Sequence, residues 1–239
     1  MKSMILAAGY GKRLGNLTKN TPKPLIKVKG KALIDFHIEK LIDSQCEKIV
    51  INVHYLADKI IDHVSTKYKD KIDIVFSKEQ NILGTGGGIK NALKYFGEED
   101  FLVINSDIYS DLDYSYFENF SSPTIFSVHK KENIAGDFSI NEGKIIVSND
   151  KDYIWTGFSI VNAKVFATTK EEPFHYWHDC LLKIAIDGNL KADILKPAEK
   201  HDFFITLNHS YLHGGFFPEK YSKLLIDFLE SDKDGIIEL

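Results

Sequence analysis

The segment SMILAAGYGKRLG, residues 3–15, decides the fold. Its apolar beginning predicts a short buried strand over residues 3–7, and the glycines predict a tight exit from that strand. Backbone amides in such a loop can approach a polyphosphate, whose charge Lys12 and Arg13 can neutralise. The dinucleotide fingerprint needs glycine where Leu14 stands and the P-loop needs one where Leu6 stands, so the segment matches neither motif. A plain strand exit is the alternative interpretation.

The segments that follow repeat the same rhythm of strand and helix. Strands of nearly continuous hydrophobic residues alternate with stretches whose apolar residues recur at helical spacing. We predict strands over 48–53, 72–76 and 101–105, helices over 33–45 and 57–68, and a third helix that begins in a glycine run and includes 91–96. This alternation predicts an α/β fold with a Rossmann-like, mostly parallel sheet flanked by helices.

After residue 113 the pattern changes to short strands separated by polar turns. These strands predict an antiparallel extension of the same sheet, and we expect one mixed domain over 1–239 with two functional halves, 1–113 and 114–239. The expected elements are strands over 124–128, 138–140, 144–147, 156–161 and 203–207, and helices over 177–186 and 218–229.

The composition is that of a globular protein and excludes several classes. The chain has 239 residues, a net charge of −4 and 44% hydrophobic residues, and this charge balance offers no basic surface to nucleic acid. No apolar run approaches the roughly 20 residues of a membrane span. We therefore expect a cytoplasmic protein that binds neither nucleic acid nor a membrane, with Cys46 and Cys180 buried and reduced.

Three further patches can carry chemistry. In TPKPL, residues 21–25, two prolines fix the backbone around Lys23, which suits a phosphate oxygen, although a solvated lysine is the commoner outcome. LGTGGGIK, residues 83–90, implies a close approach of the backbone to a ligand or a strand; a flat base could stack there, and a loop with positive φ angles is the alternative. Asp107 ends a hydrophobic strand, where a carboxylate can hold Mg²⁺ and substrate phosphate.

Together these patches resemble the sugar-1-phosphate nucleotidyltransferases, also called nucleoside-diphosphate-sugar pyrophosphorylases. The resemblance rests on MILAAG at 4–9 with Gly11 and Arg13, TPKPL at 21–25, LGTGG at 83–87 and Asp107, in the family's order and spacing over residues 1–113. It continues more weakly to Gly157. Residues 85–89, 136–138 and 156–160 are most similar to the N-acetylmuramate-1-phosphate uridylyltransferase branch, with mannose- and heptose-1-phosphate guanylyltransferases as close competitors.

The resemblance implies a role for each matching residue. The nucleotide and its α-phosphate would be held by Ala7, Ala8 and Gly9, the β- and γ-phosphates by Gly11 and Arg13, and the base by Glu79, Leu83 and Gly84. Lys23 would bind both the sugar phosphate and the α-phosphate, and Asp107 would bind the Mg²⁺ ion. The sugar would be held by Asp137, Thr156 and Gly157. Arg13, Lys23 and Asp107 would be the catalytic residues.

The resemblance also implies the reaction and the partners. A nucleoside triphosphate and a sugar 1-phosphate would give a nucleoside-diphosphate sugar and pyrophosphate, for the synthesis of cell-envelope glycans. The attacking phosphate is already an anion, so the rate depends on alignment and on neutralisation of charge. The protein is expected to be a monomer or a homodimer.

One departure from the family pattern keeps two alternatives open. Family members carry an aromatic-x-Asp-x-Gly-Thr run near the C-terminus, whose aspartate is a second Mg²⁺ ligand; residues 201–208 read HDFFITLN, which puts Ile205 at that position. Asp202 lies three residues earlier, on the opposite face of a strand. Either Asp107, phosphates and water suffice for Mg²⁺, or the chain is a catalytically weakened, nucleotide-binding relative.

A second alternative is a phosphocholine cytidylyltransferase, which shares the family's fold and N-terminal signature. A cationic headgroup usually requires an aromatic cage. Tyr153, Trp155, Phe158 and Tyr176 could supply one.

Overall fold

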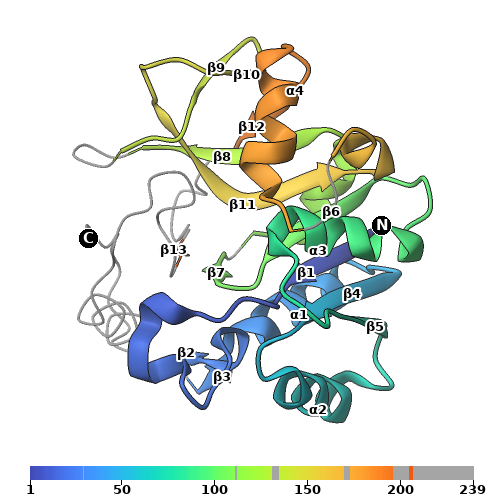
Figure 1. The fold of residues 1–239 in the computed structure, drawn as a ribbon. Coiled ribbons are helices and arrows are strands. Elements are labelled where there is room, and N and C mark those ends of the chain that lie inside the picture. The colour runs from blue at the N-terminus through green and yellow to red at the C-terminus, as the bar shows by residue number, and fades with distance from the viewer. Residues whose placement is uncertain (29, 111, 131–134, 170–172, 196–204, 207–239) are drawn as a thin grey trace.

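The computed structural model describes residues 1–28, 30–110, 112–130, 135–169, 173–195 and 205–206 (Figure 1). Within them a nine-stranded sheet has the strand order β5-β4-β1-β6-β11-β8-β12-β10-β9. Two two-stranded ladders lie beside it, β13-β7 and β2-β3. This mixed, mostly parallel core with flanking helices confirms the predicted fold class.

The parallel half of the sheet comes from the first half of the chain. Its strands are β1 (Lys2–Leu6), β4 (Lys48–Val53), β5 (Asp73–Lys78) and β6 (Phe101–Asn105), and the helices between them are α1 (Leu33–Asp43), α2 (Ala57–Tyr68) and α3 (Gly84–Ala92). β1 runs parallel to both β4 and β6, and β4 runs parallel to β5. These elements lie close to the predicted ranges, and α3 does begin in the glycine run.

Two hydrophobic cores cover the two faces of this sheet. Successive strand residues point to opposite faces, so Met4 joins the core that contains Ile89 of α3, whereas Ile5 joins the core that contains Ile38 of α1 and Ile60 of α2. α3 therefore covers one face, and α1 and α2 cover the other. The strands β1, β4 and β6 are accordingly buried on both sides, whereas the edge strand β5 is only partly buried.

The second half of the chain extends the sheet, largely as predicted. β11 (Tyr153–Val161) is antiparallel to β6 and to β8 (Thr124–His129). β9 (Ser139–Asn141) and β10 (Lys144–Ile146) form the far edge. β12 (Lys191–Ile194) runs parallel to β8 and was not predicted. Its residues are only partly buried, so they show no hydrophobic run.

The remaining elements are short. The helix predicted over 177–186 is a π-helical turn, Trp177–Leu181, that continues as α4 (Leu182–Ile186). Of the strand predicted over 203–207, β13 (Ile205–Thr206) is described, and the helix predicted over 218–229 lies outside the described residues. β2 (Lys27–Val28), β3 (Lys31–Ala32) and β7 (Ile108–Tyr109) complete the strands, with 3₁₀ turns at Lys12–Thr18, Lys23–Leu25, Leu93–Tyr95, Tyr114–Asn119 and Ala163–Phe166.

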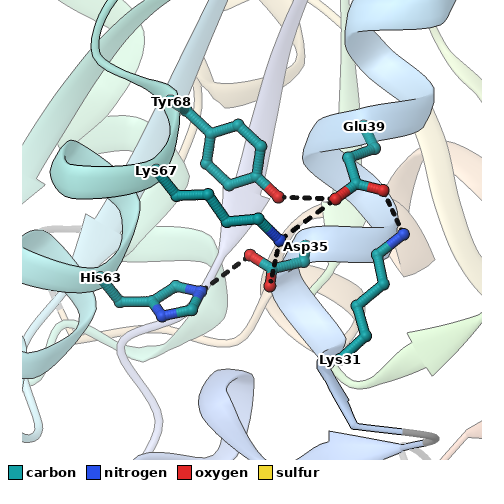
Figure 2. Close-up of polar contacts among 6 residues, drawn as sticks. All are labelled: Lys31, Asp35, Glu39, His63, Lys67 and Tyr68. Atoms are coloured by element: carbon teal, nitrogen blue, oxygen red, sulfur yellow. Dashed lines mark hydrogen bonds and ion pairs between the residues drawn. The ribbon is translucent and has the colours of Figure 1, made fainter.

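A polar network ties α1 to α2 on one face of the sheet (Figure 2). The buried carboxylate of Asp35 accepts hydrogen bonds from His63 Nε2 at 2.8 Å and Lys67 Nζ at 2.9 Å. Burial by itself would raise the pKa of Asp35, but these partners lower it below its ordinary value. Tyr68 Oη donates to Glu39 at 3.0 Å, so charged and neutral contacts together hold the two helices.

Candidate functional site

A cavity of about 440 Å³ opens at the carboxyl ends of the parallel strands. The chain moves outward from β1 to β4 and β5 and then returns to the other side of β1 as β6, so the strand order reverses between β1 and β6. Ligands of open α/β sheets bind at such a switch point. Of the residues predicted for the site, those that line the cavity are Ala7, Ala8, Gly9, Gly11, Lys23, Glu79, Gly84 and Asp107.

The first glycine loop follows β1 and forms one wall of the cavity. A Cβ added at Gly9 would meet no described heavy atom within 4 Å. Gly11 differs, because its φ of 64° is left-handed and a Cβ there would lie 2.8 Å from Thr18 Cγ2. The Thr18 hydroxyl donates to the Gly11 carbonyl at 2.9 Å, which holds the turn. The side chain of Arg13 lies outside the described residues.

Lys23 and Asp107 meet in the cavity although 84 positions separate them. Lys23 Nζ donates to Asp107 Oδ2, and the side chains are only 13% and 7% exposed. Lys23 stands in a 3₁₀ turn beside the buried Pro24, and Asp107 follows β6. Their contact places a cation where an incoming phosphate oxygen could take the place of the carboxylate as its partner.

The second glycine loop opens α3, and a neighbouring segment of the protein fills most of its space. Gly84 has a φ of 74°, and its Cβ would lie 2.5 Å from the Phe174 carbonyl oxygen. A Cβ at Gly86 would lie 2.4 Å from the Phe174 ring. The amides of Gly86 and Gly87 donate to the Phe174 carbonyl at 3.1 and 3.4 Å. The close approach predicted for this loop is therefore made by the protein itself, and the stacking place predicted for a flat base is taken at Gly86.

Glu79 follows β5 and is held from two sides. Its Oε1 accepts from Asn52 Nδ2 at 2.7 Å, and its Oε2 accepts from the Leu83 amide at 3.0 Å. Leu83 does not line the cavity; besides this hydrogen bond, its carbonyl accepts from the Phe174 amide at 3.1 Å. Asn52 was not among the predicted site residues. The signal that could have identified it is a polar residue near the end of the hydrophobic run 48–53.

Three aromatic residues in or beside the cavity wall were not among the predicted site residues. Tyr10 lines the cavity, and its hydroxyl lies 3.1 Å from His54 Nε2. His54 Nδ1 lies 2.9 Å from the Glu79 carbonyl oxygen, so His54 connects the two walls. His175 lines the cavity from the segment that caps α3. Nothing in the local sequence connects these residues, because they meet only through the sheet and the capping segment.

The residues predicted to hold the sugar lie elsewhere in the structure. Asp137 accepts from the Trp155 amide at 2.9 Å, and the Thr156 hydroxyl donates to the Phe126 carbonyl at 2.7 Å. Gly157 has a φ of 85°, and its Cβ would lie 2.6 Å from Nδ2 of the cavity residue Asn105. None of the three lines the cavity. Their role toward a sugar stays a prediction.

The aromatic residues suggested as a cage for a cationic headgroup do not form one in the described structure. Trp155 and Tyr176 are buried in the core on the α3 side of the sheet, and Phe158 is buried in the core on the α1 side. None of the cavity-lining residues belongs to this set of four, which also includes Tyr153. The sheet itself keeps Phe158 away from the other rings.

The donor set fits a Mg²⁺ ion that shares its coordination with phosphates and water. The described residues contain no group of three His, Cys, Asp or Glu side chains placed for a metal. Asp107 supplies one buried carboxylate, and one or two carboxylates with substrate phosphates are usual for Mg²⁺. β13 pairs Ile205 with Tyr109 and Thr206 with Ile108, the residue after Asp107. Ile205, at the position where the family pattern has its second carboxylate, thus lies in the strand next to the segment that follows Asp107.

Comparison with known proteins confirms the fold and shows the family. Residues 2–124 match the family model described as nucleotidyl transferase. The N-acetylmuramate alpha-1-phosphate uridylyltransferase of Neisseria meningitidis serogroup B is 40% identical over 149 residues, which is 59% of this chain and 64% of that protein. The match thus spans less than two thirds of that relative's length.

Two solved structures are similar to this chain over most of its length. The crystal structure of the HddC protein of Yersinia pseudotuberculosis has a TM-score of 0.73 and 30% identity, covering 95% of this chain and 99% of that one, and the same protein has been crystallised in complex with GMP-PN. The CTP:phosphocholine cytidylyltransferase of Streptococcus pneumoniae has a TM-score of 0.66 and 25% identity, covering 82% of this chain and 90% of that one.

Proposed function

Because the chain belongs to the nucleotidyl transferase family, we propose that it transfers a nucleoside monophosphate from a nucleoside triphosphate to a sugar 1-phosphate and releases pyrophosphate. The observation that carries this proposal is the Lys23–Asp107 pair, which lines the same cavity as the first glycine loop. The cavity combines a cation, a carboxylate and a loop with free space at Gly9, which suits a nucleotide with its phosphates better than an apolar ligand.

The proposed chemistry needs alignment and neutralisation of charge. An oxygen of the sugar 1-phosphate attacks the α-phosphorus, and the bond from that phosphorus to the bridging oxygen of pyrophosphate breaks. Lys23, held by Asp107 in a largely buried pair, would bind oxygens of both phosphates and bring them together. The loop Ala7–Gly9 would lie along the nucleotide, with Gly11 and Arg13 toward the leaving phosphates. No general base is required because the nucleophile is already an anion.

Asp107 would hold Mg²⁺, and this ion would neutralise charge on the phosphates during the transfer. The pair with Lys23 keeps the Asp107 carboxylate in the cavity wall before a ligand arrives. Since Ile205 takes the place of the second carboxylate in the family pattern, the phosphates and water would complete the coordination.

For the acceptor we propose N-acetylmuramate 1-phosphate with a uridine nucleotide, and next a mannose or heptose 1-phosphate with a guanosine nucleotide. The support is the Neisseria relative for the first pair and the GMP-PN complex of the HddC protein for the guanine base. Asp137, Thr156 and Gly157 would help to shape the sugar end, within a single domain whose halves 1–113 and 114–239 bind nucleotide and sugar. The product would serve cell-envelope glycan synthesis.

We place the reaction in the cytoplasm, where nucleoside triphosphates are made, and expect a monomer or a homodimer. Within the described part of the chain, every helix is too short or too polar to span a bilayer. Neither nucleic acid nor a membrane enters the proposed reaction.

The test is pyrophosphate release with Mg²⁺ from the four ribonucleoside triphosphates and dTTP, each paired with sugar 1-phosphates and with phosphocholine. We expect release with one sugar-phosphate pair and a loss of about 100-fold or more in Lys23→Met and in Asp107→Asn, because charge neutralisation is the main contribution. The double variant removes both charges, so it leaves no buried charge without a partner and checks that folding is retained.

Lys27→Ala is the matched control, because Lys27 is an exposed lysine of β2 that follows Lys23 by four residues. Unchanged turnover in both Lys23→Met and Asp107→Asn would refute the assignment of the site. Turnover with phosphocholine alone would favour the cytidylyltransferase, and nucleotide binding without any turnover would favour a weakened relative.

A further inference from the structure

Asn52 lies where three segments of the cavity wall come together. It is the second-last residue of β4, between Leu6 of β1 and Ser77 of β5 in the strand register. Its side chain is buried, with 3% of the residue exposed, and it lines the cavity. A polar side chain at this depth must find partners for both its donor and its acceptor.

Those partners belong to the two loops. Asn52 Oδ1 accepts from the Ala7 amide at 2.9 Å, and Asn52 Nδ2 donates to Glu79 Oε1 at 2.7 Å. Glu79 Oε2 in turn accepts from the Leu83 amide at 3.0 Å. A continuous hydrogen-bonded chain thus runs from the first glycine loop to the residue before α3.

Only one assignment of donors and acceptors fits this series of hydrogen bonds. The amides of Ala7 and Leu83 can only donate, and an ionised Glu79 can only accept. Asn52 must therefore accept on one side and donate on the other, which fixes the orientation of its side-chain amide. A change in either side chain alone creates two donors or two acceptors in contact.

Gly88 provides a second, independent observation. A Cβ at Gly88 would lie 2.7 Å from Asn52 Nδ2 and 2.7 Å from Glu79 Oε1. Gly88 lies inside α3, where alanine would otherwise be favoured. The absence of a side chain at Gly88 therefore leaves the space that the hydrogen bond between Asn52 and Glu79 occupies beside α3.

We infer that Asn52 is a positioning residue that sets the Ala7 amide and the Glu79 carboxylate as one unit and thereby controls nucleotide binding. This inference rests on the proposed function, since it takes the nucleotide to lie between these two loops. Asn52 acts through Ala7 and Glu79 rather than on the reacting phosphates. Its effect should appear in the affinity for the nucleotide, and the affinity for the sugar phosphate should stay unchanged.

The sharpest test exchanges the two side chains. Asn52→Asp places two carboxylates in contact, and Glu79→Gln leaves one contact between two donors. The double variant Asn52→Asp with Glu79→Gln restores all three hydrogen bonds with the same net charge. In it the new side-chain amide at position 79 can donate to the new carboxylate at position 52 and accept from the Leu83 amide. We expect about tenfold weaker nucleotide binding in each single variant and recovery to within about threefold in the double variant.

Three measurements separate the outcomes: urea unfolding of the unliganded protein, nucleotide affinity by calorimetry, and KM for both substrates. Rescue of nucleotide affinity and of the nucleotide KM in the double variant, with the sugar-phosphate KM constant throughout, supports the inference. Wild-type nucleotide affinity in both folded single variants overturns it, as does rescue of stability without rescue of affinity. Asn141→Asp, in an exposed position of β9, is the control for the added charge.

This design keeps the inference apart from the proposed function. A wild-type protein that binds nucleotide without turnover would contradict the proposed function, while the exchange of Asn52 and Glu79 could still be read from affinity. A protein with normal turnover whose single variants bind nucleotide normally would contradict the inference alone.

Discussion

The two glycine loops of the cavity look alike in sequence but differ in what surrounds them. The first loop leaves open space at Gly9, whereas Gly84, Gly86 and Gly88 of the second loop would each bring a Cβ within 2.7 Å of another protein atom. Phe174 occupies the space at two of these positions, and the pair of Asn52 and Glu79 occupies it at the third. Gly9 thus leaves space in one wall of the cavity, whereas the glycines of the second loop, like Gly11 of the first, leave space for the protein itself.

This difference separates two kinds of preorganisation. The second loop is held in one conformation without a ligand, because the Phe174 carbonyl accepts hydrogen bonds from the amides of Gly86 and Gly87. The first loop lines the cavity together with the charged pair of Lys23 and Asp107 and leaves open space at Gly9. Substitutions in the second loop should therefore change mainly the free energy of unfolding, and substitutions at Gly9 mainly the affinity for the nucleotide.

The largest effect we expect concerns the charged pair beside the first loop, through His37, which lies near Asp107. This residue of α1 is fully buried, its Nδ1 lies 2.7 Å from the Tyr114 hydroxyl, and the charge of Asp107 acts on it. Burial lowers the pKa of His37 to about 4 from its ordinary 6.5. The unfolded chain then binds the proton first as the pH falls, so the stabilisation is complete above about pH 6.5 and is lost toward pH 4, by about 3 kcal/mol in all.

The check is urea unfolding of the wild type and of His37→Asn at several pH values. The free energy of unfolding of the wild type should fall more steeply than that of the variant between about pH 6.5 and 4. Parallel curves would show that His37 binds its proton as readily in the folded protein as in the unfolded chain, which would contradict the prediction. Other carboxyl groups contribute equally to both curves, so the difference isolates His37.

The next effect should come from the second loop, in Gly86→Ala. The added methyl group would meet the Phe174 ring at 2.4 Å and the Tyr176 nitrogen at 3.1 Å, so the capping segment has to move. We expect a loss of about 2 kcal/mol in the free energy of unfolding. In a Phe174→Leu background the same substitution should cost less, and equal losses in both backgrounds would contradict contact with the ring.

The smallest effect on stability should come from Gly9→Ala in the first loop. The methyl group meets no described atom within 4 Å, so the free energy of unfolding should change by less than about 0.5 kcal/mol. Nucleotide binding should weaken, because the methyl group takes space that the loop leaves to the ligand. A stability loss as large as that of Gly86→Ala would remove the contrast between the loops, as would unchanged nucleotide affinity.

The secondary structure was largely predictable because buried parallel strands and amphipathic helices leave local patterns. Residues 48–53 and 57–68 have the predicted bounds as β4 and α2. β12 was missed because its residues are partly buried and show no alternation. In the site, Lys23 and Asp107 could be singled out from local motifs, but their contact could not, since it depends on where β6 lies beside β1.

The sequence by itself determined the order of strands and helices, the family resemblance and the set of charged and small residues at the strand ends. These are local properties, because each strand or loop carries its own pattern of apolar, glycine and proline residues. The tertiary structure alone decided which glycines have open space and which contact other protein atoms, that Phe174 caps α3, and that Asn52 joins Ala7 to Glu79. Such contacts join residues at least 27 positions apart in the chain. Only the packing of the sheet and its helices brings these residues within hydrogen-bonding distance.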